Sequence, residues 1–141
     1  MNINALEATF HLSHAIKQHL GSQLEAKNLN IAPMHVRVLK VINKHQSCTA
    51  IDIASFFKRD KAQITRLVKQ LIELDFVKKK PNPEDKRSQL LVLTPQGTAL
   101  QKSLSVFSED LQKQITQGIN AEDLATFVKV AEKMTSNLSN A

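Results

Sequence analysis

The fold is decided by residues 49–97, which read TAIDIASFFKRDKAQITRLVKQLIELDFVKKKPNPEDKRSQLLVLTPQG. Thr49 is a favourable helix N-cap. The apolar residues after it predict a short helix over 50–57 that buries Ile51 and Ala54, with Phe57 as a further candidate for burial. The two residues that follow leave room only for a turn.

A second, strongly amphipathic helix is predicted over 60–74. Asp60-x-x-Gln63 resembles a capping box, in which two side chains satisfy unpaired N–H groups at a helix start. Apolar residues at steps of three and four form one stripe, namely Ile64, Leu67, Val68 and Leu71. Two helices joined by a short turn, the second of them amphipathic, are typical of a helix-turn-helix.

After Leu74 the pattern changes to that of strands. Residues 76–80 and 88–93 are rich enough in apolar and β-branched side chains to predict two short strands. The segment 81–87 between them holds two prolines, which bar a regular strand or helix there. We therefore expect a hairpin with a basic tip, a wing. Thr94-Pro95 then begins another helix, with Thr94 as its N-cap.

Helices dominate the rest of the chain. Apolar periodicity predicts them over 5–28, 33–44, 95–117 and 121–138. Glycine is scarce, at 3 of 141 residues, which fits long helices with few tight turns. The expected fold class is mainly α with a small β-hairpin wing: a winged helix-turn-helix flanked by N- and C-terminal helices.

The positive charge is concentrated in one segment. Residues 58–87 hold ten Lys or Arg and five Asp or Glu, which gives +5 of the net charge of +6. The other 111 residues hold nine basic and eight acidic groups. Such a concentrated field suits a polyanion, most simply nucleic acid, although a solvated lysine face is the alternative that charge alone leaves open.

Composition excludes several classes of protein. The longest apolar run, Leu90–Leu93, is far shorter than a membrane span, and the N-terminal residues lack the pattern of a secretion signal. A lone cysteine, Cys48, rules out an internal disulfide framework and fits a reducing cytoplasm. We expect a cytoplasmic protein that uses no membrane and no cofactor.

Residues 85–97, DKRSQLLVLTPQG, resemble the wing of the MarR family of bacterial transcriptional regulators. That wing usually reads D-x-R, then an apolar strand, then L-T-x-x-G. Residues 64–71, ITRLVKQL, are similar to the family's recognition helix, and the order of elements matches over the whole chain. One departure is Asp75, where the family often has glycine. Asp tolerates the left-handed backbone conformation, so we expect little cost.

The resemblance implies an architecture and a set of partners. Residues 1–141 would form one MarR-like domain, with dimerisation helices in 1–28 and 95–141 and the winged helix-turn-helix in 33–94. The partners would be a second copy of the chain and a pseudo-palindromic operator in double-stranded DNA. A repressor relieved by a small effector is the expected mode of regulation.

The helix opened by Asp60 supplies the candidate base contacts. With its apolar stripe inward, it turns Ala62, Thr65, Arg66 and Lys69 outward, with Gln63 at the edge. Arg66 and Gln63 are the best candidates to read guanine or adenine edges, and Thr65 suits a thymine methyl or a phosphate. Lys61 and Lys69 suit phosphates. The Thr49 hydroxyl and neighbouring N–H groups could hold a further phosphate.

By the same resemblance, Arg87 of the wing would enter the minor groove, and Asp85 would hold its side chain in position. Lys86 would contact a phosphate. The run Lys78–Lys80 would add others, although alternate strand residues face opposite sides. The competing interpretation is that Asp85 only caps the turn and Arg87 is solvated.

Three weaker signals concern other ligands. His11 and His14 have a spacing that suits a metal, but nothing completes a site, so we expect no metal site.

In the family, effectors often bind between the dimerisation helices and the winged domain. An anionic or aromatic compound there would meet His14, Lys17 or Arg37. Cys48 precedes a helix N-terminus that could lower its pKa, but an inert thiol is our interpretation.

No catalytic constellation is visible, so we expect no enzyme. Other binding modules remain as alternatives. Single-stranded RNA binding is disfavoured because Trp and Tyr are absent and Phe56, Phe57 and Phe76 occupy expected core positions. A low-specificity nucleoid protein, or a winged helix that binds proteins, stays open.

Overall fold

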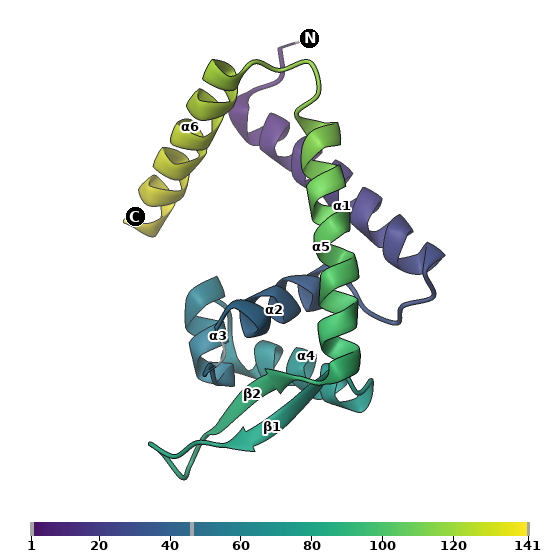
Figure 1. Ribbon diagram of the computed structural model, residues 1–141. Helices are drawn as coiled ribbons and strands as arrows, with labels where there is room; N and C mark the ends of the chain where they lie inside the picture. Colours follow the sequence, from purple (N-terminus) through teal and green to yellow (C-terminus); the bar gives the residue numbers. More distant parts are fainter. Residues whose placement is uncertain (1, 46, 141) are drawn as a thin grey trace. The chain divides into compact units, whose positions relative to one another are not determined.

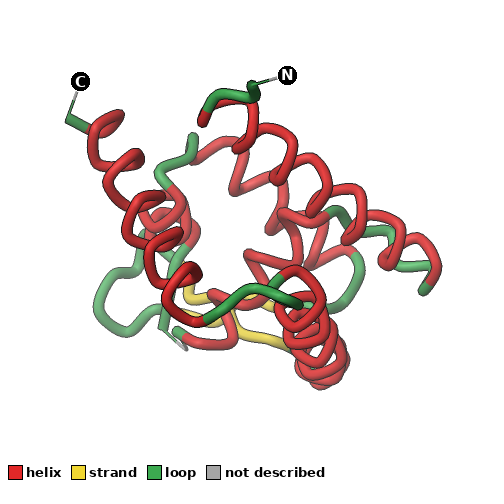
Figure 2. The backbone as a smooth tube through the Cα atoms, turned by 90° about the horizontal axis from the view of Figure 1, so that it is seen from above, coloured by secondary structure: helices red, strands yellow, loops and turns green. Residues whose placement is uncertain are grey.

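The computed structural model describes residues 2–45 and 47–140. Within them it has six α-helices and two strands (Figure 1). In chain order these are α1 (Ala5–Ala26), α2 (Pro33–Lys44), α3 (Ala50–Phe57), α4 (Lys61–Glu73), β1 (Val77–Pro81), β2 (Gln89–Leu93), α5 (Pro95–Ile115) and α6 (Ala121–Ser139). The predicted fold class is confirmed, and the two strands lie side by side as an antiparallel hairpin (Figure 2). No helix in these two ranges is long and apolar enough to cross a membrane.

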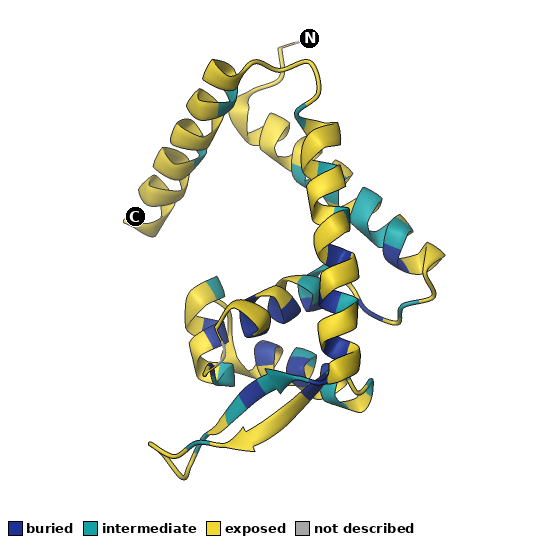
Figure 3. Ribbon diagram, in the orientation of Figure 1, coloured by how far each residue is buried: buried dark blue, intermediate teal, exposed yellow. Residues whose placement is uncertain are grey.

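The chain divides into two compact units, residues 1–104 and 105–141, and α5 contributes to both. The first unit holds the core (Figure 3). There α2 packs against α4 and β2, and α3 packs against α4. The most deeply buried side chains come from α2, α3, α4 and β1, namely Val38, Leu39, Ile42, Ile53, Ile64, Leu71 and Val77. The second unit contains α6, in which none of the described residues is buried.

The prediction for the interior of α3 was partly wrong. Ala54 is buried as expected, but Ile51 is 52% exposed, and Ile53 takes the inward position instead. Phe56 is 62% exposed, and only Phe57 and Phe76 of the three phenylalanines are half-buried. The physical reason is that an eight-residue helix turns one narrow face to the core, and Ile53 and Ala54 fill it.

The predicted capping box at Asp60 and Gln63 is also not what the structure shows. Asp60 does cap α4, since its carboxylate accepts from the Ala62 N–H at 3.4 Å. The Gln63 side chain, however, accepts a hydrogen bond from Arg59 at 3.5 Å rather than reaching back to the cap. The reciprocal box lies one helix earlier, at Thr49 and Asp52.

Element ends differ from the predictions by one or two residues. We expected the first strand to end before Pro81, but the structure includes this residue in β1. Proline is tolerated there because it is the last paired residue of a strand whose outer edge needs no N–H donor. Helix α1 stops at Ala26, before Asn28 takes a positive φ of 55°. Helix α5 stops at Ile115, ahead of Gly118.

The start of α5 is locked to the turn after α4. Asp75 adopts φ 65°, which confirms that Asp serves where the family often has glycine. The Thr94 hydroxyl donates to the Asp75 carbonyl at 2.6 Å and accepts from the Gly97 N–H at 2.9 Å. A Cβ added at Gly97 would lie 1.9 Å from the carbonyl oxygen of Phe76. The T-x-x-G pattern therefore describes one tightly packed junction.

A buried histidine joins α2 to α4. The Ala32 N–H donates to Nδ1 of His35 at 2.9 Å, which leaves the proton on Nε2. Nε2 then donates to Oε1 of Gln70 at 2.7 Å. His35, which the sequence left without a role, thus ties the start of α2 to the exposed side of α4.

We predict that Gly97→Ala destabilises the protein by about 1–3 kcal/mol, because the new methyl group meets backbone that can move only with the junction. Chemical denaturation measures the free energy of unfolding. Gly21→Ala in α1 is the matched control, since nothing lies within 4 Å of its Cβ and alanine favours a helix. Equal stability of Gly97→Ala and the wild type would contradict this account of the junction.

Candidate nucleic-acid interface

The turn between α3 and α4 is held by backbone hydrogen bonds. Lys58 takes a left-handed conformation with φ 52°. Its N–H donates to Ser55 at 3.2 Å, and the Arg59 N–H donates to Ala54 at 2.9 Å. This pair of bonds is the Schellman arrangement that ends many helices. It sets the direction in which the chain enters α4.

One face of α4 is in the core and the other is exposed. Ile64, Val68 and Leu71 are buried, and Leu67 is half-buried. All six residues of α4 that the sequence assigned to DNA are exposed, namely Lys61, Ala62, Gln63, Thr65, Arg66 and Lys69. The helix therefore presents polar and basic side chains to solvent while its apolar face fills the core.

The hairpin is attached to the start of α3. The Leu91 N–H donates to the carbonyl oxygen of Cys48 at 2.9 Å, which forms an isolated bridge beside the hairpin. Leu91 itself is buried, and it pairs with Lys79 of β1. The base of the wing is thus fixed against the helix-turn-helix.

The tip of the hairpin is shaped by its own side chains. The Asp85 carboxylate accepts from the backbone N–H of Arg87 at 2.9 Å, and the Asn82 side chain accepts from the Glu84 N–H at 3.0 Å. The Asn82 amide also donates to the Ser88 hydroxyl at 3.0 Å. Asp85 therefore caps the turn that carries Arg87. A contact between this carboxylate and the Arg87 guanidinium stays a prediction.

A groove of about 780 Å³ joins the wing to the helices. It brings together six of the ten predicted residues, namely Thr49, Lys61, Thr65, Lys69, Lys86 and Arg87. Ala62, Gln63, Arg66 and Asp85 are exposed but do not line it. Of the three consecutive lysines in β1, Lys79 lines the groove and its neighbours do not, as strand alternation requires.

The groove also contains residues that the sequence reasoning missed. Ile51, Ser88 and Gln89 line it, and so does one carboxylate, Glu73. Strand alternation could have found Gln89, which lies two residues from Leu91 on the same strand. Ile51 could not be found, because its apolar character predicted burial.

The start of α3 is already occupied by a carboxylate. Asp52 accepts from the Thr49 N–H at 2.9 Å, and the Thr49 hydroxyl accepts from the Asp52 N–H at 3.2 Å. The Thr49 N–H is therefore engaged and does not serve a phosphate, although the hydroxyl keeps a hydrogen to donate. A smaller hollow of about 420 Å³ beside it is lined by Asp52, Glu84 and Asp85, so negative charge borders one side of the wing.

Cys48 is 4% exposed and carries a free thiol. Burial raises the pKa of this thiol above its usual value, and the charge of Asp52 raises it further. The suggestion that the helix N-terminus lowers the pKa of this thiol is therefore wrong, because burial and the nearby Asp52 carboxylate together raise it. The interpretation as an inert thiol fits this environment.

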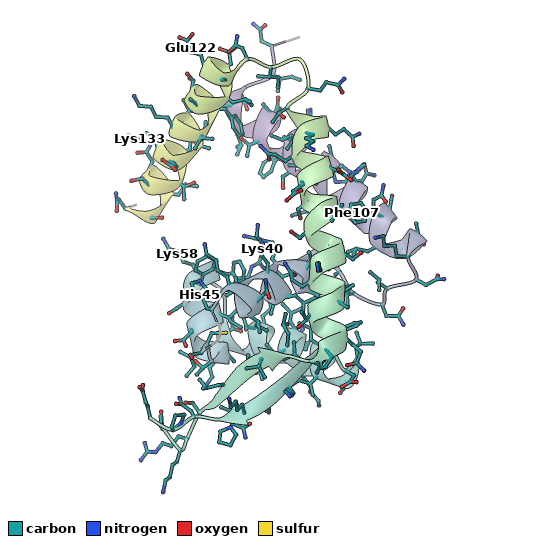
Figure 4. The ribbon with its side chains drawn as sticks, viewed as in Figure 1. Lys40, His45, Lys58, Phe107, Glu122 and Lys133 are labelled. Carbon is teal, nitrogen blue, oxygen red and sulfur yellow. The ribbon has the colours of Figure 1, made fainter. Side chains whose placement is uncertain are left out.

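The candidate effector residues lie on α1 and α2. His14 and Lys17 are exposed on α1. The Arg37 guanidinium of α2 lies over the Phe57 ring, 4.7 Å from its centroid. Other basic groups, among them Lys40 and Lys58, lie on the side of α2 and α3 away from the hairpin (Figure 4). In the described part of the chain, no three metal-ligating side chains gather into a cluster.

Comparison with known proteins places these features in context. The model of the MarR family matches residues 31–89. The multiple antibiotic resistance protein MarR of Escherichia coli (strain K12) is 27% identical over 107 residues, which cover 75% of this chain and 74% of that protein. The uncharacterized HTH-type transcriptional regulator YdgJ of Bacillus subtilis (strain 168) is 26% identical over 125 residues, 89% and 76% of the two chains.

Solved structures share the fold. A Staphylococcus aureus MepR–DNA complex superimposes with a TM-score of 0.88 at 20% identity, covering 96% of both chains. A MarR/EmrR family transcriptional regulator from Acinetobacter sp. ADP1 gives a TM-score of 0.84 at 21% identity, covering 99% of this chain and 100% of that one.

Two substitutions on α4 separate base reading from phosphate binding. We predict that Arg66→Ala costs about 1–3 kcal/mol of binding to the preferred DNA sequence and relaxes base preference. Lys69→Ala should weaken binding evenly across sequences and lower the salt dependence by about one counterion. Titrations of specific and random duplexes at several salt concentrations measure both. If both variants lose equally on both duplexes, Arg66 does not read a base.

Proposed function

We infer that this chain belongs to the MarR family and is a DNA-binding transcriptional regulator, and we propose that it acts as a homodimeric repressor on a pseudo-palindromic operator. The observation that carries the proposal is the groove that gathers Thr49, Lys61, Thr65 and Lys69 with Lys86 and Arg87 of the wing. In this groove cations from two separate elements converge on one surface.

The two elements suit two neighbouring grooves of duplex DNA. Helix α4 is exposed along the face that carries Gln63, Thr65 and Arg66, and it would enter the major groove. The tip at 81–87 would place Arg87 in the adjacent minor groove. With two-fold symmetry the two recognition helices would lie about 34 Å apart, one helical turn of DNA.

Exposed apolar side chains on the terminal helices support the dimer. Phe127 is 56% exposed in a helix with no buried residue among those described. Large apolar side chains are also exposed at Leu6, Phe10 and Leu12 of α1 and at Val128, Val130, Met134 and Leu138 of α6. Apolar groups in this number are unusual on a monomer, which supports the proposal that a second copy covers this surface. In the proposed architecture, 1–28 and 95–141 are the dimerisation segments and 33–94 is the winged part of one MarR-like domain.

Regulation by an effector is a further part of the proposal. The MarR family consists of transcriptional regulators, which are not enzymes. An anionic or aromatic effector near His14, Lys17 and Arg37 would find an exposed cation on each of two helices, α1 and α2. The cytoplasm, where a bacterial regulator meets DNA, is the proposed location.

Selection of bound sequences from random duplex DNA, with the full chain near physiological salt, tests the function. Recovery of an inverted repeat is the expected result, because a two-fold dimer reads two equivalent half-sites. Enrichment without a motif would instead support a low-specificity nucleoid protein. No retained DNA would mean that the basic wing serves another partner, such as a protein.

The dimer is tested at α6. We predict that Phe127→Glu shifts the protein from dimer to monomer at micromolar concentration, because it buries a charge in an apolar interface. Sedimentation equilibrium measures the change. Lys129→Glu is the control, since two residues along a helix it points to the opposite side. A stable monomer of the wild type would contradict this part of the proposal.

A further inference from the structure

One side of α2 carries a row of cations that does not belong to the proposed DNA site. Arg37, Lys40 and Lys44 are exposed and lie three and four residues apart, so they share one side of the helix. No Asp or Glu occurs between residues 33 and 44. None of the three cations lines the groove between the wing and α4. Lys40 lies on the side of α2 away from the hairpin (Figure 4).

An exposed aromatic ring lies beside this row, at the end of α3. The Phe56 side chain is 62% exposed. Its ring centroid is 6.3 Å from that of His45 and 5.1 Å from that of Phe57. The Arg37 guanidinium lies over the Phe57 ring, at 4.7 Å from its centroid. The two helices thus present a surface that is aromatic at its centre and cationic around it. We call it the α2–α3 surface, and it consists of Arg37, Lys40, Lys44, His45, Phe56 and Lys58.

A hollow of about 470 Å³ opens next to Phe56. Val41 and Cys48, which are both buried, form its apolar wall. Of the described residues that line it, only Asp52 carries a carboxylate, and this group accepts from the Thr49 N–H at 2.9 Å. The hollow therefore suits an apolar side chain that packs beside the Phe56 ring, as anchor residues do at protein interfaces.

The chemistry of this surface favours an acidic protein segment over nucleic acid. A row of cations attracts any polyanion, so the aromatic centre decides between them. The backbone of duplex DNA has no apolar side chain to fill the hollow. Single strands stack successive bases on aromatic faces. The Phe56 ring is tilted by 55° to His45 and by 83° to Phe57, so no parallel ring continues such a stack. Exposed aromatic and Arg side chains are enriched at protein interfaces.

We propose that the α2–α3 surface binds an acidic segment of a protein partner. The carboxylates of this segment lie along Arg37, Lys40 and Lys44, and one aromatic or aliphatic side chain packs beside Phe56. Arg37 is also a candidate effector residue, and here it serves the carboxylates of the segment. The inference goes beyond DNA binding, because the surface lies on the side of α2 and α3 away from the wing (Figure 4). The regulator would therefore hold DNA and the protein segment at the same time.

Selection from a library of random short peptides, with the full chain immobilised, tests the proposal. We expect enrichment of peptides in which several Asp or Glu residues flank one aromatic or aliphatic residue. An enriched peptide is then labelled and titrated by fluorescence anisotropy. Phe56→Ser and Lys40→Glu should each weaken its binding by about tenfold or more, because the first removes the apolar contact and the second reverses a charge. Replacing the apolar residue of the peptide by serine should have an effect of the same size.

Lys79→Glu is the matched control, because it makes the same change of charge in the DNA groove. It should leave peptide binding within about twofold, since the groove and the α2–α3 surface lie on different sides and salt screens distant charges. Thermal unfolding of both surface variants is measured as well. Lys40 is fully on the exterior of α2, so Lys40→Glu keeps the test valid if Phe56→Ser alters packing against Phe57.

Four results would overturn the inference. The first is a selection without any enriched acidic motif. The second is peptide binding that is lost in Lys79→Glu but kept in Lys40→Glu, which assigns the peptides to the DNA groove. The third is a labelled single-stranded oligothymidine that binds with the same dependence on Phe56, which assigns the surface to nucleic acid. The fourth is a change of oligomeric state in Phe56→Ser, which assigns it to a second copy of the chain. The proposed function is judged separately, by the selection of duplex DNA.

Discussion

The arrangement of the interface depends on the burial of one face of α4. Ile64, Val68 and Leu71 each enter the core, and a helix whose apolar stripe is buried cannot rotate about its axis. The opposite face must then carry the polar and basic residues outward. His35 adds a polar restraint through Gln70, which fixes α4 against the start of α2. The direction of the exposed basic face of α4 is thus a consequence of core packing.

The second constraint is the position of the wing, and backbone hydrogen bonds supply it. The bridge between Cys48 and Leu91 holds the hairpin at the start of α3, and the Thr94–Gly97 junction holds its other end against the turn after α4. Because both anchors belong to the first unit, Arg87 and Lys69 reach one groove although they are 18 positions apart in the sequence. Basic residues that are only close together in the sequence therefore face one groove in the structure.

Helices and strands followed from local pattern, and the two errors have separate causes. The stripe of α4, the caps Thr49, Asp60 and Thr94, and the left-handed Asp75 are properties of neighbouring residues, so they were predictable. The exposure of Ile51 and the hydrogen-bond partner of Gln63 were not predictable in this way. Hydrophobicity alone does not say which side of a short helix meets the core, and several donors compete for one exposed amide.

The sequence by itself determined the order of elements, the basic segment at 58–87 and the residue types that suit duplex DNA. These depend on periodicity and composition, which are local. Only the tertiary structure decided which cations share the groove, that Ile51 is exposed, and that His35 joins α2 to Gln70 of α4. The reason is physical: hydrogen bonds and burial are shared among segments distant in the chain, and which partner wins depends on how those segments pack.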